Sequence, residues 1–289
     1  MEGVPTHADD GWGEDDNPRR YDAFAREYPN YRETSRDLIA LALPSDDTGA
    51  ANPAVLDLAC GTGATTREIL AVLGPDGSVT GVDKSAAMLR VAASSTTDPR
   101  VSWTQGFAES VNQHVPGPVD AVICNSAIWQ TDLPTTAMAV RAVMKDGGVF
   151  AFNVPVDFLD DGDSRLSRDR YPPLVTEMQA IAEREYGWTP ADEPAGRVRQ
   201  WLSRQSICRS LAAAGFDVEQ VAEVSHQDSA ESQRAWLSIP IFTRDRLRGL
   251  PYEDRMRVLD KAYERLGPGQ AERAKWVVFL GRVYGLSRS

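Results

Sequence analysis

The sequence predicts an α/β fold in which the strands of a parallel sheet alternate with helices along the chain. Residues 55–63, Val-Leu-Asp-Leu-Ala-Cys-Gly-Thr-Gly, show an apolar strand pattern that ends in an acid and two glycines and leads into a helical pattern. A second apolar segment, residues 78–82, is followed at once by Asp83. The length of 289 residues fits one large domain with insertions. We therefore expect the chain to be organised around the turn at residues 57–63.

Gly61 and Gly63 indicate a sharp turn at which the backbone comes close to a ligand. A Cβ atom at either position would obstruct that approach. A dinucleotide-binding turn would have a small residue at position 66, where this chain has Thr66. The carboxylate of Asp57 suits a ligand that carries an ammonium group better than one that carries a pyrophosphate. The turn therefore predicts a nucleoside ligand other than NAD, with a tight turn that binds nothing as the alternative.

Asp83 is predicted at the tip of a second strand, beside the first turn. Both hydroxyls of a ribose lie within reach of a carboxylate in that place. Each charge-assisted hydrogen bond of this kind contributes about 1.5 to 3 kcal/mol. Asp83 is therefore the expected partner of the ribose.

Residues 57–63 together with Val82 and Asp83 resemble the class I S-adenosylmethionine-dependent methyltransferase family, of the small-molecule type, from about Tyr21 to the C-terminus. Ala59 stands at the first small position of the family's glycine turn. The resemblance implies a doubly wound, seven-stranded Rossmann-like methyltransferase sheet with helical lid insertions. It implies S-adenosylmethionine (SAM) as the cofactor, with the turn holding its methionine part and Asp83 its ribose. The residues expected to bind SAM are Asp57, Ala59, Gly61, Gly63, Asp83, Lys84, Met88, Phe107, Ala108, Asn125, Tyr21 and Tyr28.

The N-terminal part is predicted to be a flexible acidic arm, residues 1–20, followed by cap helices in residues 21–50. The arm is rich in Asp, Glu, Gly and Pro and has little to bury. The helical spacing of apolar residues is interrupted at Pro29, which predicts two short helices. In the resembling family such helices lie across the cofactor, so Tyr21 and Tyr28 could line the pocket, where aromatic rings attract a sulfonium. Aromatic packing of helix on sheet is the alternative.

The ends of the third and fourth strands supply further candidates. Phe107 and Ala108 follow the third strand, and we expect the adenine to rest against the ring of Phe107 while backbone groups near Ala108 bond its edge. The fourth strand, residues 120–125, ends in Asn125 at the edge where ligands of an open α/β sheet bind. Residues 125–128, Asn-Ser-Ala-Ile, differ from the Asn/Asp-Pro-Pro-aromatic motif of amino-adenine and glutamine-amide methyltransferases. This difference argues against nucleic-acid and protein-amide substrates.

Asn153 and His226 are the candidate catalytic residues. Asn153 lies near the end of the fifth strand, residues 149–154, where its amide would orient the acceptor or merely satisfy free backbone groups. His226 follows a sixth strand at residues 217–224. In the family's topology this strand is parallel to the others, which would put His226 on the ligand side as a general base. A surface histidine without a catalytic role is the alternative.

Two insertions interrupt the predicted methyltransferase domain, residues 21–289. Residues 155–196 depart from the strand and helix alternation and are predicted to form a substrate lid. Residues 230–272 show helical patterns before the last strand and would cover the substrate or form a homodimer contact. Three helices are expected in this second insertion, at residues 232–239, 247–249 and 252–266.

The composition limits the partners. A formal net charge of −11 and a pI near 4.8 disfavour binding to a nucleic-acid backbone. No apolar run approaches the length of a membrane span, and the N-terminus lacks a signal-peptide pattern, so we expect a cytoplasmic protein that binds no membrane. Three widely spaced cysteines indicate reduced packing residues, and we predict no metal site.

The predicted function is SAM-dependent methylation of a small organic metabolite in secondary metabolism. The sulfonium makes the methyl group electrophilic, so the main task of the protein is to orient the acceptor, which can supply on the order of 7 to 11 kcal/mol of the barrier. A SAM-dependent cyclase that releases methylthioadenosine is an alternative from the same cofactor. A non-catalytic SAM-binding module is the third possible function.

Overall fold

The computed structural model describes residues 11–14, 16–43, 52–159, 173–190, 202–244, 246–267 and 272–284. Predictions for the remaining residues lie outside the described part. They concern the first ten residues of the acidic arm, the end of the predicted cap-helix segment at 44–50, and much of the predicted lid, at 160–172 and 191–196.

Within the described residues, seven strands form one sheet in the order β3-β2-β1-β4-β5-β7-β6. Their bounds are β1 Ala54–Leu58, β2 Ser78–Asp83, β3 Val101–Gln105, β4 Val119–Cys124, β5 Met144–Pro155, β6 Asp217–Asp228 and β7 Glu272–Arg282. β7 is antiparallel to its neighbours β5 and β6, whereas the neighbours from β3 to β5 pair in parallel. The predicted seven-stranded α/β sheet is confirmed.

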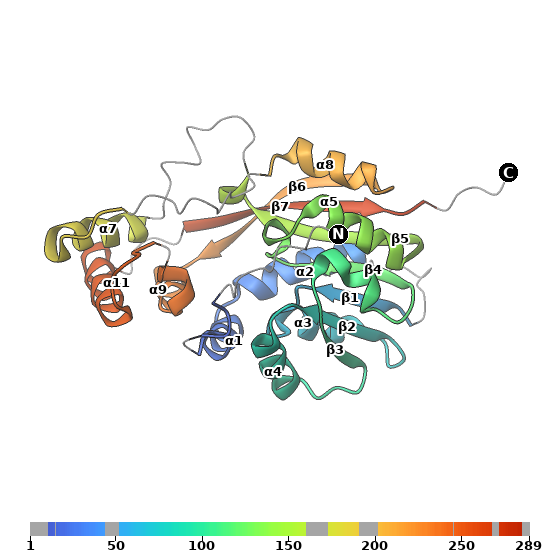
Figure 1. The fold of residues 1–289 in the computed structure, drawn as a ribbon, viewed down its shortest axis with the longest axis horizontal. Coiled ribbons are helices and arrows are strands. Elements are labelled where there is room, and N and C mark those ends of the chain that lie inside the picture. The colour runs from blue at the N-terminus through green and yellow to red at the C-terminus, as the bar shows by residue number, and fades with distance from the viewer. Residues whose placement is uncertain are drawn as a thin grey trace, which may run out of the picture.

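Helices cover both faces of this sheet (Figure 1). On β1, Val55 belongs to a buried cluster with α2 (Asn30–Ala42) and α3 (Ala64–Val72). Its neighbour Leu56 belongs to a second cluster with α5 (Leu133–Val143) and α8 (Arg204–Ala213). Successive side chains of a strand point to opposite faces, so each central strand contributes to both cores and the sheet is doubly wound. The other elements beside the sheet are α1 (Asn17–Glu27), α4 (Ala86–Ser95), η1 (Ala108–Gln113), η2 (Ile128–Gln130) and η3 (Val156–Phe158).

Four further helices gather at the carboxyl ends of the strands, at the left of Figure 1. They are α7 (Pro173–Tyr186), α9 (Ala230–Leu237), α10 (Pro240–Arg244) and α11 (Tyr252–Leu266), and we call them the helical cap. Met178 of α7 shares a buried cluster with Leu237 of α9 and Val258 of α11. The described part of the predicted lid therefore packs on the insertion that precedes the last strand.

The cap is attached to the sheet by a two-stranded ribbon. β5 pairs with β7 as far as the partners Pro155 and Trp276, whereas β6 and β7 stay paired to Asp228 and Glu272. The sixth strand is therefore longer than the predicted 217–224. Polar side chains after Val224 suggested an end there, but ladder hydrogen bonds to β7 satisfy the backbone whatever the side chains are.

The N-terminal segment begins its ordered structure earlier than predicted, because α1 starts at Asn17 and not at Tyr21. The ring of Trp12 packs edge-on against Tyr21 and Phe242, with ring centroids 5.5 and 5.6 Å apart. The predicted free arm is therefore wrong for the described residues from 11 to 20. The aromatic contact with Phe242, more than 200 positions away, helps to fix this stretch, and local composition does not reveal it.

One predicted helix of the second insertion is also misplaced. Residues 247–249 are not helical, and α10 lies at Pro240–Arg244 instead. Leu247 is fully buried in the turn that leads to α11, so its apolar character reflects packing and not helical periodicity.

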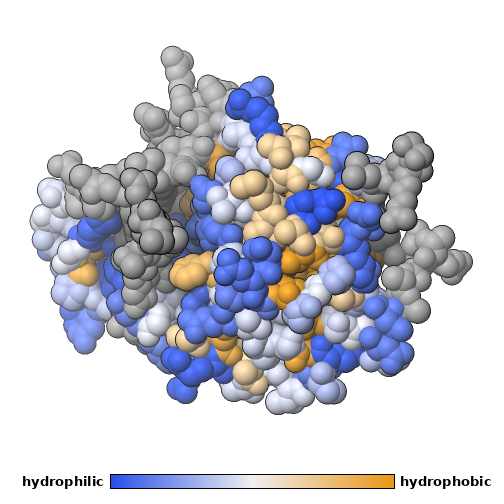
Figure 2. All heavy atoms as spheres, turned by 45° about the vertical axis from the view of Figure 1, so that its right-hand side comes forward, coloured by the Kyte–Doolittle hydropathy of each residue, from blue (hydrophilic) through white to orange (hydrophobic). Residues whose placement is uncertain are grey.

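Hydrophilic residues cover much of the molecular face in Figure 2, and apolar areas on it are interrupted by them. No helix within the described residues is long and apolar enough to cross a membrane.

Candidate functional site

The glycine turn after β1 has the backbone conformation that a close approach requires. Gly61 and Gly63 have φ values of +54° and +78°, in the left-handed region. The nearest atom to a Cβ built at Gly61 is Cε1 of Tyr21, at 4.0 Å, so the space above the turn is open to a ligand. A Cβ at Gly63 would lie 2.6 Å from the ring of Trp103 on β3. The two glycines therefore serve different purposes: one leaves room for a ligand and the other for a ring.

Trp103 is a neighbour of the turn that the sequence interpretation missed. Its ring would also lie 2.5 Å from a Cβ at Gly81, on β2. Glycines at both positions make room for this single ring. The available signal was the isolated Gly81 within a strand pattern, which often marks close approach of another group.

Ala59 is an alanine with φ +56°, in the same left-handed region. We expect Ala59→Gly to raise the free energy of unfolding by about 0.5 to 1 kcal/mol, because relief of a penalty of about 1 to 2 kcal/mol outweighs the greater freedom of the unfolded chain. Urea denaturation measures this change. Ala87→Gly, in the right-handed helix α4, is the control and should lose about 1 kcal/mol. If both variants had a lower free energy of unfolding than the natural protein, the strain at Ala59 would be contradicted.

Asp83 joins the ends of β1 and β2. Its Oδ2 accepts the backbone N–H of Gly61 at 2.8 Å, and its Oδ1 accepts the backbone N–H of Ser85 at 2.8 Å. Ser85 caps α4 by accepting the N–H of Met88, as its sequence position predicts. A carboxylate has about four lone-pair sites, so Asp83 keeps capacity for ligand hydroxyls while it holds the turn.

Asp57 is a buried carboxyl group at the end of β1, with 1% of its surface exposed. Its Oδ2 accepts a short hydrogen bond of 2.5 Å from the hydroxyl of Thr66. Burial raises the pKa of Asp57 to about 7, and the negative charge of Asp83 adds to the rise. Thr66, the residue that breaks the dinucleotide pattern, is thus the group that holds the acid.

Tyr21 lies close to the glycine turn, because its Cε1 is the nearest atom to a Cβ built at Gly61. Its ring packs against Tyr31 with the centroids 5.1 Å apart. Burial raises the pKa of the Tyr21 phenol well above its ordinary value, and the nearby Tyr31, Asp83 and Asp57 raise it further. Tyr31 accepts a 3.4 Å hydrogen bond from the indole nitrogen of Trp236 in the helical cap. These rings form an aromatic roof that connects the turn with the cap.

Arg67 fastens α1 to the glycine turn. One guanidinium nitrogen donates to the carbonyl oxygen of Thr62 at 3.0 Å, and another contacts Asp22 of α1 at 3.0 Å. Asp22 is buried and also accepts from Ser95 of α4 at 3.3 Å. Neither Asp22 nor Arg67 was a candidate from the sequence, because nothing local indicates that they meet.

We expect Arg67→Met to weaken SAM binding about tenfold and to lower the free energy of unfolding by about 1 to 2 kcal/mol, because Asp22 would lose one of its two guanidinium partners and keep Arg26 at 2.8 Å. Calorimetric titration and urea denaturation measure the two effects. Arg36→Met is the matched control, since Arg36 forms an ion pair of 2.7 Å with Glu68 between α2 and α3 but is 64% exposed. This control should change both quantities little. Equal effects of the two variants would argue against the fastening role.

Asn125 and Asn153 meet at the ends of β4 and β5. The amide nitrogen of Asn153 donates to the amide oxygen of Asn125 at 2.9 Å, and its own oxygen accepts the backbone N–H of Ser126 at 2.6 Å. Asn125 donates to Ser35 and to the carbonyl oxygen of Tyr31 on α2. Asn153 is fully buried, and its amide engages Asn125 and the backbone of Ser126. A role of Asn153 in orienting an acceptor stays a prediction.

His226 is held on the far side of α2 from this network. Its Nε2 lies 2.6 Å from Asp37 and its Nδ1 lies 3.3 Å from Glu33. Asp37 and Glu33 are each two residues from Ser35, hence roughly 160° around the helix from it. Because α2 separates His226 from Asn125, the structure does not bring the two side chains together, and the role of His226 as a general base stays a prediction. Strand direction alone could not show which face of α2 the imidazole meets.

The remaining candidates fall in two places. The segment with Phe107 and Ala108 begins beside Asp83, because the N–H of Gly106 donates to the Asp83 carbonyl oxygen at 3.0 Å. Ala108 is buried and the Phe107 ring is 46% exposed. Lys84 follows Asp83 directly and is half-buried, and Met88 is buried in the first turn of α4. Tyr28, by contrast, lines a cavity with residues of α9 and α11, away from the glycine turn.

Tyr28 is therefore not a residue of the glycine turn. It is the residue that ends α1, and its ring stacks on Phe24 with the centroids 5.0 Å apart. The helical spacing that places Tyr21 over the turn carries Tyr28 two turns further along, toward the cap.

A family model described as a methyltransferase domain matches residues 55–148. The match begins in β1 and ends in β5, so it includes the glycine turn and Asp83. Over this segment the chain thus contains a methyltransferase domain. The N-terminal helices, α8, β6, β7 and the helical cap lie outside the matched segment.

Curated relatives of this methyltransferase domain match part of the chain. A malonyl-[acyl-carrier protein] O-methyltransferase of Halalkalibacterium halodurans is 33% identical over 134 residues, which are 44% of this chain and 49% of the relative. A ubiquinone/menaquinone biosynthesis C-methyltransferase of Pseudomonas paraeruginosa is 27% identical over 173 residues, 56% of this chain and 64% of the relative. The chain thus spans about half to two thirds of the length of these relatives.

A solved structure extends the likeness over most of the chain. A putative sarcosine dimethylglycine methyltransferase from Galdieria sulphuraria superposes with a TM-score of 0.54 at 15% identity. The superposition covers 93% of this chain and 99% of the other. At this identity the likeness shows the fold.

Proposed function

We propose that this protein binds SAM at the glycine turn and transfers its methyl group to a small organic acceptor, as part of secondary metabolism. The observation that carries the proposal is the pair of carboxylates, Asp57 and Asp83, at the ends of adjacent parallel strands with an open left-handed turn between them. Such an arrangement matches a ligand with an ammonium at one end and a ribose at the other.

Each part of the cofactor has a partner of suitable chemistry under this proposal. Asp83 accepts the ribose hydroxyls, and Asp57 faces the ammonium of the methionine part. Phe107 offers an exposed ring to the adenine, with Ala108 beside it. Tyr21 covers the turn, where its ring face attracts a positive sulfonium. Bound SAM would supply an electrophilic methyl group.

Orientation of the acceptor is the main catalytic device that we propose. Burial raises the pKa of Tyr21 and of Tyr31, so their phenols stay protonated near neutral pH. They can donate hydrogen bonds to an acceptor, but they do not abstract its proton. The proposal therefore favours an acceptor that reacts once it is held in line with the methyl group.

The relatives point to different acceptor atoms, since one is named as an O-methyltransferase and the other as a C-methyltransferase. For this chain we propose only a small organic acceptor. A cytoplasmic location, a homodimer and the absence of a nucleic-acid partner stay predictions.

Identification of the nucleoside product tests the proposal. The protein is incubated with SAM and a panel of small organic acceptors, and the products are separated by mass spectrometry. S-adenosylhomocysteine is the expected product. Methylthioadenosine would instead indicate a cyclase, and calorimetric SAM binding without any nucleoside product would indicate a binding module.

A further inference from the structure

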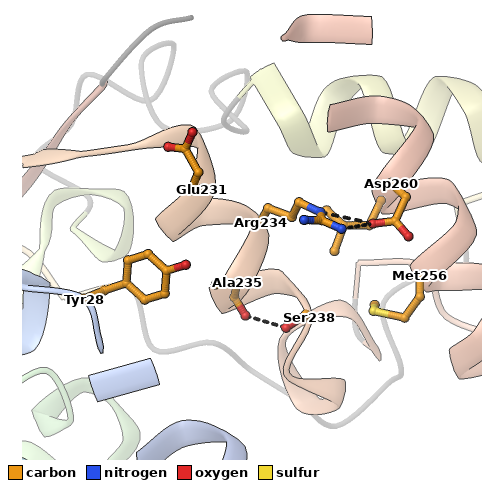
Figure 3. A pocket seen from close by; sticks show the side chains of 8 residues that line it. Tyr28, Glu231, Arg234, Ala235, Ser238, Met256 and Asp260 are labelled. Carbon is orange, nitrogen blue, oxygen red and sulfur yellow. Dashed lines mark hydrogen bonds and ion pairs between the residues drawn. The ribbon is translucent and has the colours of Figure 1, made fainter. Parts of the chain in front are cut away.

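A cavity apart from the glycine turn lies between the end of α1 and the helical cap (Figure 3). Its volume of about 430 Å³ falls within the range of small-molecule sites. Ala235 of α9 and Met256 and Leu259 of α11 supply apolar surface to it. Tyr28 contributes from the opposite side, with its hydroxyl directed toward α9. The residues that line the cavity are distinct from those of the glycine turn.

Among the described residues that line this cavity, Arg234 is the one basic side chain, and it is already neutralised. Arg234 donates through two nitrogens to Asp260, at 3.0 and 2.7 Å. Its guanidinium also lies over the ring of Tyr263, 5.2 Å from the centroid. An anionic ligand would meet the negative charges of Asp260 and Glu231, so the cavity is poorly suited to carboxylates and phosphates.

Glu231 is the cavity's carboxylate without a basic partner. It accepts a hydrogen bond of 3.2 Å from the hydroxyl of Tyr263. Among the described residues, no lysine, arginine or histidine forms an ion pair with it. Its own backbone N–H, and then the hydroxyls of Ser229 and Tyr263, lower the pKa of Glu231, so this carboxylate stays ionised at neutral pH. The part of the cavity that the structure describes therefore carries a net negative charge beside apolar surface.

Tyr28 and the negative charge of Glu231 together suit a cationic group. An ammonium group between Glu231 and the Tyr28 ring would gain both a charge-assisted hydrogen bond and a cation–π contact. The apolar side chains of α9 and α11 would cover the hydrocarbon part of the same molecule. Together these groups match an amine with an apolar body.

We propose that this cavity binds the ammonium end of the acceptor, which is thus an amine with an apolar body. The inference rests on the proposed methyl transfer at the glycine turn. Tyr21 and Tyr28 are seven residues apart on nearly the same side of α1, hence roughly 10 Å apart along the helix. The methylated atom therefore lies at the other end of the molecule from the ammonium that Glu231 holds.

Probe binding to the full chain tests this inference without any turnover. Phenethylamine, phenethyl alcohol and 3-phenylpropionate are titrated separately by calorimetry near neutral pH, in the absence of SAM. We expect the amine to bind, the alcohol to bind at least about fivefold more weakly, and the carboxylate not to bind. Glu231→Gln should weaken amine binding about fivefold, the upper range for an exposed ion pair. Tyr28→Leu should weaken it as well.

Glu183→Gln is the matched control, because Glu183 is an exposed carboxylate of the cap that does not line the cavity. This variant should bind the amine as the natural sequence does. Equal binding of amine and carboxylate, an unchanged affinity in Glu231→Gln, or no binding of any probe at millimolar concentration would overturn the inference. SAM binding to the natural protein is measured in parallel. If SAM did not bind, the methyl-transfer proposal would be refuted separately from the result at the cavity.

Discussion

Replacing Asp83 with asparagine is expected to weaken SAM binding by about a hundredfold. The amide cannot accept hydrogen bonds at both positions, so it loses either the Gly61 N–H or the Ser85 N–H that the carboxylate now holds at 2.8 Å. It also replaces charge-assisted bonds to the ribose hydroxyls by weaker ones. Loss of about 3 kcal/mol from the bonds to the ribose hydroxyls corresponds to a factor of more than one hundred in affinity. Calorimetric titration with SAM measures the change.

Asp120→Asn is the control for this prediction, because Asp120 performs a similar backbone task at the opposite edge of the sheet. Its Oδ2 accepts the N–H of Ala54 at 2.8 Å and pairs with Lys145 at 2.8 Å. This variant should lose some stability but keep its affinity for SAM within about twofold. If both variants lost affinity equally, the loss would reflect damage to the sheet, and the role assigned to Asp83 would fail.

The strands and the glycine turn could be predicted because their signals are local. An apolar run followed by Asp57, Gly61 and Gly63 determines where β1 ends and how the chain turns, and the structure agrees. The same local pattern predicted Asp83 at the end of β2. Carboxyl ends of neighbouring parallel strands must lie together, so these two acids could be brought into one site without coordinates.

The contacts that orient the site are long-range, and the sequence could not reveal them. Arg67 reaches back to Asp22, and Trp236 reaches Tyr31 across more than 200 positions. The sequence also could not show which residues His226 contacts, because its place on the far face of α2 depends on the rotation of that helix. Local periodicity specifies which residues share a helix face, but not which partner that face meets.

The helical cap is another long-range feature with a functional consequence. Two segments separated by the sixth strand pack into one cluster, and Trp236 ties that cluster to the aromatic roof over the turn. Arg20 of α1 adds a hydrogen bond of 2.8 Å to Tyr252 at the start of α11. Movement of α1 would therefore change its contacts with both the glycine turn and the cap. The proposed acceptor region and the glycine turn thus share the same supporting helix.

Asp57 leads to the second large effect, a pH dependence of SAM binding. The carboxyl is buried and has a pKa of about 7, so it is mostly protonated below that pH in the cofactor-free protein. An ammonium binds the ionised form, so SAM affinity should rise as pH increases toward 7 and level off above it. The expected gain is roughly eightfold between about pH 6 and pH 7.5, which follows from the ionised fraction at a pKa near 7. Titrations in two buffers with different ionisation enthalpies should detect proton release on binding below pH 7.

The stability of the cofactor-free protein should change in the opposite direction. The folded-state pKa of Asp57 lies above its unfolded value, so its contribution to stability is fully present below about pH 4 and is lost as pH rises through about 7. The full span is on the order of 4 kcal/mol. Asp57→Asn imitates the protonated carboxyl at every pH, and its amide oxygen can still accept from the hydroxyl of Thr66. Near pH 8 this variant should therefore be more stable than the natural protein without SAM, yet bind SAM more weakly. If its SAM affinity kept the natural pH dependence, another group would be responsible, and Asp57 would not be the partner of the ammonium.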